Sequence, residues 1–358
     1  MRRKLYDAER YEVLAAVYPQ EELRVKRENI GAYRTKVTRA GDFLYISCYP
    51  LITASAREEQ ESRLAELDDA LAERKNIKLR TRWNRYNNAR RVTEFEQLVH
   101  ANFVPGDLHV SCTYAFDDWD KGGPPEGISR QRAKADVHNY LRRVKRLLKR
   151  HDVDMSEFRW ICVTVTKEGV YEAAKERPDR HHHHLLMHGV PESLRNEVER
   201  LWGMGYCNAD RIQDDKNTGI ARMAGYVARQ EGSANGERSG ERSYTCSRNI
   251  IRPTVTVSDA KVSIRRVCQI AADVRVNGKE ILEKIWKGYR LSEEPVVRTS
   301  DFVAGAYIRV RLRKEDSTGK WAGRGRSGLK STGSARRDTW SSGASACSMI
   351  NTGGRTGS

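Results

Sequence analysis

The chain has 358 residues, of which 65 are Lys or Arg and 48 are Asp or Glu, so its formal net charge is +17. Its length supports one large core or two modest ones, while seven scattered cysteines without a CxxC pair argue against a disulfide scaffold or a zinc ribbon. Without a membrane-spanning run or a secretory signal we expect a cytoplasmic protein, and the basic excess favours nucleic acid as its partner.

The first hundred residues mix short apolar runs with charged stretches. Residues 41–50 predict a strand, and residues 54–75 predict an exposed helix whose leucines recur every three or four positions. Residues 94–99 close a further helix. We assign residues 1–100 to an N-terminal accessory region.

From residue 107 onward, predicted strands and amphipathic helices alternate. Residues 107–116 alternate apolar with polar side chains, as a half-buried strand does. Ser129 is the expected N-cap of a helix that reaches residue 150 and has one apolar and one basic face. Two further strands are predicted over residues 159–166 and 180–187.

Two more helices follow these strands, one from Pro191 to Trp202 and the other over residues 220–230. Strands separated by amphipathic helices predict an α+β fold, with helices packed on a sheet. We expect an extension of helices and strands over residues 257–316. Residues 317–358 predict a disordered basic tail, because they hold 9 Gly, 9 Ser and seven Lys or Arg against one Asp, without apolar periodicity.

Four consecutive histidines, His181 to His184, are the most distinctive local feature of the sequence. Side chains alternate faces along a strand, so His182 and His184 share one face and the other two share the opposite face. Two imidazoles spaced in this way can bind one divalent cation, and a nearby carboxylate, Glu168 or Glu172, would complete the ligand set. An exposed histidine patch is the alternative interpretation.

Tyr226 lies on the flank of the predicted helix over residues 220–230. A tyrosine in such a position is usually a packing residue, and its phenol is a weak nucleophile unless it is activated. A metal bound to a target phosphate would polarise the phosphoryl oxygens. Arg222 or Arg229, each about one helical turn from Tyr226, would stabilise developing negative charge.

Together these elements resemble the rolling-circle replication initiators of the HUH endonuclease superfamily. That family is named for two histidines that flank one residue, here His182 and His184 around His183. Its tyrosine motif ends in a lysine, whose place after Tyr226 is taken by Arg229. Two further segments fit the family pattern, namely Trp202 to Gly205 and residues 247–253.

The resemblance implies an HUH fold with a central antiparallel sheet, a catalytic domain over residues 101–256, and cleavage of single-stranded origin DNA by Tyr226 through a 5′-phosphotyrosyl intermediate. It implies Mg²⁺ or Mn²⁺ held by His182, His184 and Glu168. A host polymerase would extend the free end, and a host helicase would unwind the DNA, because the sequence contains no Walker A motif. The expected DNA contacts are Arg142, Arg143, Arg146, Arg222 and Arg248.

Three alternatives stay open at this point. A single-tyrosine transposase would use the same chemistry, although such enzymes are usually much shorter. A mobilisation relaxase would usually carry a third histidine, which the sequence does not identify. A non-catalytic, basic nucleic-acid-binding protein would leave the histidines and Tyr226 without a role in chemistry. The sequence also leaves open whether a phage, a plasmid or an integrated element encodes the protein.

Overall fold

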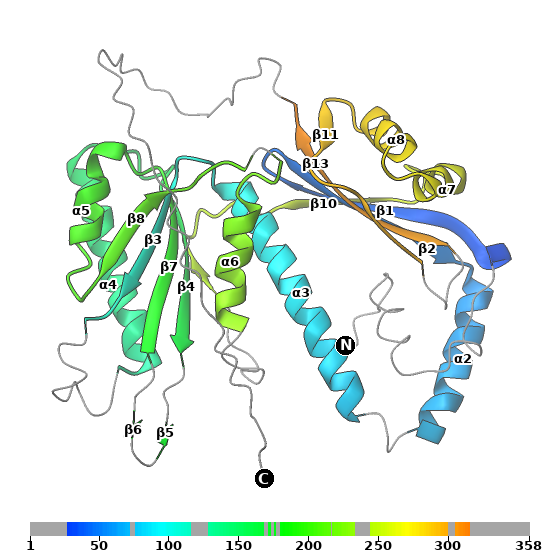
Figure 1. The fold of residues 1–358 in the computed structure, drawn as a ribbon, viewed down its shortest axis with the longest axis horizontal. Helices are drawn as coiled ribbons and strands as arrows, with labels where there is room; N and C mark the ends of the chain where they lie inside the picture. Colours follow the sequence, from blue (N-terminus) through cyan, green and yellow to red (C-terminus); the bar gives the residue numbers. More distant parts are fainter. Residues whose placement is uncertain are drawn as a thin grey trace, which may run out of the picture. The chain divides into compact units, whose positions relative to one another are not determined.

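The computed structural model describes residues 27–71, 76–115, 128–167, 171–172, 175–176, 180–215, 217–232, 244–299 and 305–315. Within these ranges the chain has an α+β fold with two antiparallel sheets (Figure 1). The tail predicted over residues 317–358 and the candidate ligand Glu168 lie outside the described residues. Among the described helices, none has the length and apolar character that a membrane crossing requires.

The first sheet, here called the histidine sheet, is antiparallel and contains the four histidines in its middle strand. In the order in which they pair, its strands are β8 (Cys207–Arg211), β3 (Leu108–Thr113), β7 (Arg180–His188), β4 (Arg159–Lys167) and β9 (Thr245–Cys246). The three strands predicted in this region are confirmed, with shifts at their ends. Beyond β4 the chain forms a separate two-stranded pair of β5 (Tyr171–Glu172) and β6 (Lys175–Glu176).

Helices cover both faces of the histidine sheet, and they are α3 (Asn76–Asn102), α4 (Arg130–Arg150) and α6 (Ala221–Gly232). Helix α4 packs on one face, whereas α3 and α6 lie side by side on the other (Figure 1). Ser129 caps α4 as predicted and accepts a hydrogen bond of 3.2 Å from the backbone N–H of Arg132. The helix predicted after Pro191 is divided into η2 (Glu192–Leu194) and α5 (Arg195–Arg200).

The second sheet has six antiparallel strands and a separate apolar core. Its strands are β10 (Thr254–Ser258), β1 (Ile30–Ala40), β2 (Phe43–Ile52), β13 (Ala306–Lys314) and β11 (Tyr289–Leu291), with β12 (Val296–Thr299) also paired to β13. Helices α7 (Ile264–Ala272) and α8 (Asn277–Ile285) pack on one face (Figure 1). Two elements flank the β1–β2 hairpin, namely η1 (Arg27–Asn29) and α2 (Ala54–Leu71).

The second sheet is the part of the fold that the sequence predicted least well. Strand β2 and helix α2 agree with the predicted elements, but β1 was not predicted, and of α3 only the last turns were. Strands β1 and β2 come from the region that we assigned to residues 1–100, yet they pair with β10 and β13. A local pattern does not show which distant segment a strand will pair with, so the sequence did not predict how this sheet is assembled.

Candidate active site

Strand β7 directs two histidines to the face of the histidine sheet that α6 covers. Leu186 is buried in the apolar cluster shared with α3 and α6, whereas Leu185 and Met187 are buried in the cluster under α4. This alternation puts His182 and His184 on the α6 face together, as the strand periodicity predicted. Their ring centroids are 5.2 Å apart, in an edge-to-face arrangement.

Tyr226 lies on α6 next to these histidines. Ile220 and Val227 anchor the helix in the apolar cluster, and Tyr226 on its flank keeps 49% of its surface exposed. The centroid of its ring lies 5.7 Å from that of His184, again edge to face. The structure therefore brings together His182, His184 and Tyr226, and leaves the tyrosine accessible to a ligand.

His109 of β3 joins this group, although the sequence analysis did not identify it. Strand β3 pairs with β7 so that Ser111 is opposite His184. Nε2 of His109 and Oγ of Ser111 each lie 3.2 Å from Nδ1 of His184, and the two imidazoles stack. One signal was present in the sequence, because His109 and Ser111 alternate with the apolar residues of the predicted strand.

Burial favours the neutral form of the His184 and His109 imidazoles. Loss of water contact, together with the neighbouring His109 and His182, lowers the pKa of His184 to about 4. Burial also lowers the pKa of His109, and the charge of Asp210 opposes that shift. A neutral imidazole has the free lone pair that metal coordination requires, so near neutral pH these rings have the protonation state of metal ligands.

The hydrogen bonding of His184 indicates whether the cluster could hold a metal ion. Nε2 of His184 is buried without a hydrogen-bond partner, whereas Nδ1 has two possible partners. When Nδ1 donates its proton to one of them, Nε2 offers its lone pair to a cation. No group of three or more His, Cys, Asp or Glu side chains within the described ranges is arranged as a metal site, and the described side chains include neither Glu168 nor Glu172.

His183 points to the opposite face, under α4, and is fully buried. Thr164 Oγ1 lies 3.0 Å from its Nδ1, and the Tyr114 hydroxyl lies 3.1 Å from its Nε2. Because that hydroxyl donates its proton to the Asp136 carboxylate at 3.4 Å, Nε2 of His183 carries the ring proton and Nδ1 accepts from Thr164. Burial and the neighbouring histidines lower the pKa of His183 to about 3.

The segment from Trp202 to Gly205 packs closely against the end of β3, which explains why a tryptophan and a glycine occupy these positions. Trp202 is fully buried and its Nε1 donates a hydrogen bond of 2.7 Å to the carbonyl of Thr113. Gly205 has a φ of +145°, and a Cβ at this position would lie 2.1 Å from the backbone nitrogen of Ala115. Because only glycine tolerates this approach, the segment can hold Trp202 against the ring of His183.

Two of the predicted DNA-contacting arginines, Arg222 on α6 and Arg248 after β9, are exposed. Arg222 is exposed, with its Nη1 3.5 Å from Oδ2 of Asp215. Arg248 is exposed just after β9, in a segment whose backbone is held by two hydrogen bonds of 2.8 Å between Asn102 and Ile251. Both arginines stay predicted as DNA contacts.

Arg229 follows Tyr226 by about one turn of α6, and its guanidinium lies over Gly225. Burial raises the pKa of Glu96 on α3, and the positive charges of Arg311 and Arg229 oppose that rise. Arg229 therefore acts electrostatically on the neighbouring helix. Its role toward a phosphate stays a prediction.

The three arginines predicted on α4 lie on the face of the histidine sheet opposite to Tyr226. Arg142 and Arg146 are exposed, whereas Arg143 is partly buried and donates to the carbonyl of Trp202 at 3.2 Å. Any DNA contact by these residues would therefore use a surface separate from the histidine cluster.

Comparison with protein-family models, with curated protein sequences and with solved structures gives no match for this chain. The resemblance drawn from the motifs depends on the identities and order of His182, His184 and Tyr226 along the chain.

Proposed function

We propose that the protein is a metal-dependent, single-tyrosine DNA endonuclease and strand transferase that initiates rolling-circle replication. The observation that carries the proposal is the distance of 5.7 Å between the ring centroids of Tyr226 and His184, with His182 on the same strand face. A nucleophile and a pair of nitrogen ligands on one face of a sheet are what a metal-assisted attack on a phosphodiester requires.

Tyr226 supplies the nucleophile in this proposal. Its oxygen attacks the phosphorus of one phosphodiester, the bond to the 3′ oxygen breaks, and the phenol proton ends on that oxygen. The products are a 5′-phosphotyrosyl link and a free 3′-hydroxyl, and attack by a 3′-hydroxyl on that link rejoins the strands. Mg²⁺ or Mn²⁺ held by His182 and His184 supplies polarisation of the phosphoryl oxygens when it is bound.

Single-stranded origin DNA is the proposed substrate, and the net charge of +17 supports a polyanionic partner. Arg222 and Arg229 would balance negative charge that develops on the phosphate. A host polymerase would extend the free 3′-hydroxyl, and a host helicase would separate the strands.

A covalent-adduct assay tests this proposal. Labelled single-stranded DNA is mixed with the protein and Mn²⁺ or Mg²⁺, and adducts are resolved on a denaturing gel. We expect adducts with the wild type and with Tyr206→Phe, a control in which the changed tyrosine is 68% exposed, but none with Tyr226→Phe or after addition of a chelator. An adduct with Tyr226→Phe would show that the nucleophile is wrong. Binding without any adduct would favour the non-catalytic alternative.

A mobilisation relaxase is a second candidate, because His109 supplies a third imidazole next to His184. Both enzymes cut DNA through the same tyrosine adduct, so the adduct assay does not separate them. Maintenance of a plasmid that carries the cut site would indicate a replication initiator. Transfer of that plasmid to a recipient cell without support of its replication would indicate a relaxase.

A further inference from the structure

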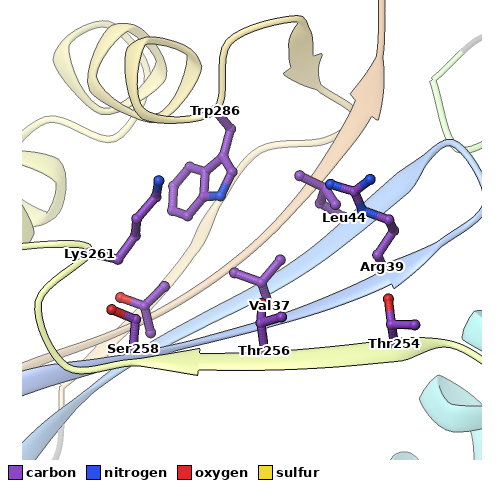
Figure 2. A pocket seen from close by; sticks show the side chains of 9 residues that line it. Val37, Arg39, Leu44, Thr254, Thr256, Ser258, Lys261 and Trp286 are labelled. Carbon is purple, nitrogen blue, oxygen red and sulfur yellow. The ribbon is translucent and has the colours of Figure 1, made fainter.

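The second sheet carries a cavity of about 500 Å³ that the proposed chemistry does not use. Its floor is formed by β10, β1 and β2, and its walls include the end of α8 and the turn after β10 (Figure 2). This volume lies in the range of about 300–1,000 Å³ that is usual for small-ligand sites. The chemistry of its lining therefore indicates what it would bind.

Among the residues that the structure describes, two cations and no carboxylate line the cavity. Arg39 extends from the exposed end of β1, and Lys261 follows β10 (Figure 2). Across the part of the chain that the structure describes, neither side chain has an ion-pair partner. Unpaired cations in a concave surface attract an anion, and a phosphate is the anion that a basic protein of this charge most often meets.

Hydroxyl groups form much of the cavity floor. Thr254, Thr256 and Ser258 lie on alternate positions of β10 and therefore on one face, opposite Arg39, Val37 and Thr35 of β1 in the strand register. All three β10 residues are exposed. Threonine and serine hydroxyls commonly donate to the phosphate and sugar oxygens of DNA.

Trp286 provides a flat apolar surface above this floor (Figure 2). The ring belongs to the core of the second sheet, where it packs with Leu282 and its neighbours, and only 9% of the residue is exposed. Its orientation is therefore fixed by packing. The part of the ring that lines the cavity can contact a nucleic-acid base of any sequence.

We infer that this cavity binds one nucleotide of a DNA strand, with the phosphates on its two sides at Arg39 and Lys261 and its base at Trp286 between them. The identity of the strand as DNA rests on the proposed function. The segment that leads from β9 into β10 is held by the pair of hydrogen bonds between Asn102 and Ile251. The cavity is lined by the second sheet, whereas Tyr226 lies on α6 against the histidine sheet, so the cavity would bind a part of the strand that Tyr226 does not cut and would add to affinity without taking part in the chemistry.

Fluorescence anisotropy of the full chain with a labelled mixed-sequence single strand tests the inference. We compare Arg39→Gln/Lys261→Gln with Lys36→Gln/Lys279→Gln, which removes the same charge from β1 and α8 outside the cavity lining. Loss of two phosphate contacts predicts roughly tenfold weaker binding at physiological salt and a salt slope lower by about 1.4, relative to the control. Trp286→Leu keeps an apolar core residue and predicts a loss of about tenfold, provided that circular dichroism shows a folded protein.

The outcomes separate this inference from the proposed function. Equal affinity of the two double variants would overturn the inference, whether or not the wild type forms the Tyr226 adduct. A selective loss in the cavity variant would support it, even if no adduct forms. A free mononucleotide that competes as strongly as the strand would overturn it, because the cavity would then be a site for free nucleotides.

Discussion

The imidazole of His109 stacks on that of His184 with 5.4 Å between the ring centroids, so a residue of the neighbouring strand β3 orients one of the two candidate metal ligands. Partners that orient a ligating histidine typically contribute about 10–100-fold to metal affinity or activity. His109→Leu should therefore raise the Mn²⁺ concentration needed for adduct formation by about that factor. An Mn²⁺ titration of the adduct assay measures it.

The matched control for this variant is His138→Leu, because His138 is exposed on α4, on the other face of the histidine sheet. Its Mn²⁺ requirement should equal that of the wild type. If the two variants shift the requirement equally, His109 has no specific role at His184.

Leu186 and Leu185 are adjacent in β7 but support different faces of the sheet. Both are at most 1% exposed, so replacement of either leucine by alanine should lower the free energy of unfolding by about 2–5 kcal/mol. Only Leu186 packs in the cluster that holds α6. At a temperature where both variants are folded, Leu186→Ala should therefore slow adduct formation by Tyr226, and Leu185→Ala should not. Equal rates in the two variants would contradict this.

Because His183 is hydrogen-bonded to Thr164, a second substitution should restore part of the stability that a substitution of His183 removes. His183→Leu removes one hydrogen-bond partner of the partly buried Thr164 hydroxyl, which should cost about 1 kcal/mol of stability. The double variant His183→Leu/Thr164→Val removes both polar groups and should recover much of that loss. Urea denaturation measures the three proteins. If the double variant loses as much free energy of unfolding as the two single variants together, the hydrogen bond is not the cause of the loss.

The imidazole of His100 on α3 predicts a pH dependence of stability. It stacks on Phe43 at 4.0 Å, and burial together with the charges of Arg311 and Arg313 lowers its pKa from an ordinary 6.5 to about 3. The unfolded chain binds a proton in this interval and the folded chain does not. Stability therefore decreases as pH falls from about 6.5 to 3, by about 1.4 kcal/mol per pH unit from this group alone.

Comparison with His100→Phe isolates this contribution from that of the carboxylates. The variant should show a shallower decrease in the free energy of unfolding between about pH 6 and pH 4, measured by chemical denaturation. Parallel curves for the two proteins would mean that His100 titrates normally in the folded state.

Local periodicity was enough to predict most of the candidate site. The period of two along β7 predicted that His182 and His184 share a face, and the helical stripe of α6 predicted that Tyr226 lies on its flank. Both follow from backbone geometry over a few residues, and neighbours in the fold do not change them. The alternation along residues 107–116 showed that His109 lies on the polar face of its strand, but its position beside His184 depends on which strand pairs with β7, and the sequence does not show that.

Strand pairing was also what the sequence could not predict for the second sheet. Strand β1 runs antiparallel to β10, and Val37 pairs with Thr256. Strands β1 and β10 are separated by more than 200 residues in the sequence, so neither segment alone indicates that the other is its partner. The cavity with Arg39 and Lys261 exists only once these segments have met.

This chain order has a consequence for synthesis on the ribosome. The histidine sheet is complete once Cys246 has been made, whereas β1 and β2 must wait for β10 and β13 before their sheet can close. Since chains emerge N-terminus first and domains tend to fold as units, the histidine–tyrosine cluster can assemble while the earliest strands are still without partners. A nascent chain stalled before residue 254 would then expose the apolar face of the β1–β2 hairpin, which makes that stage the one most in need of a chaperone.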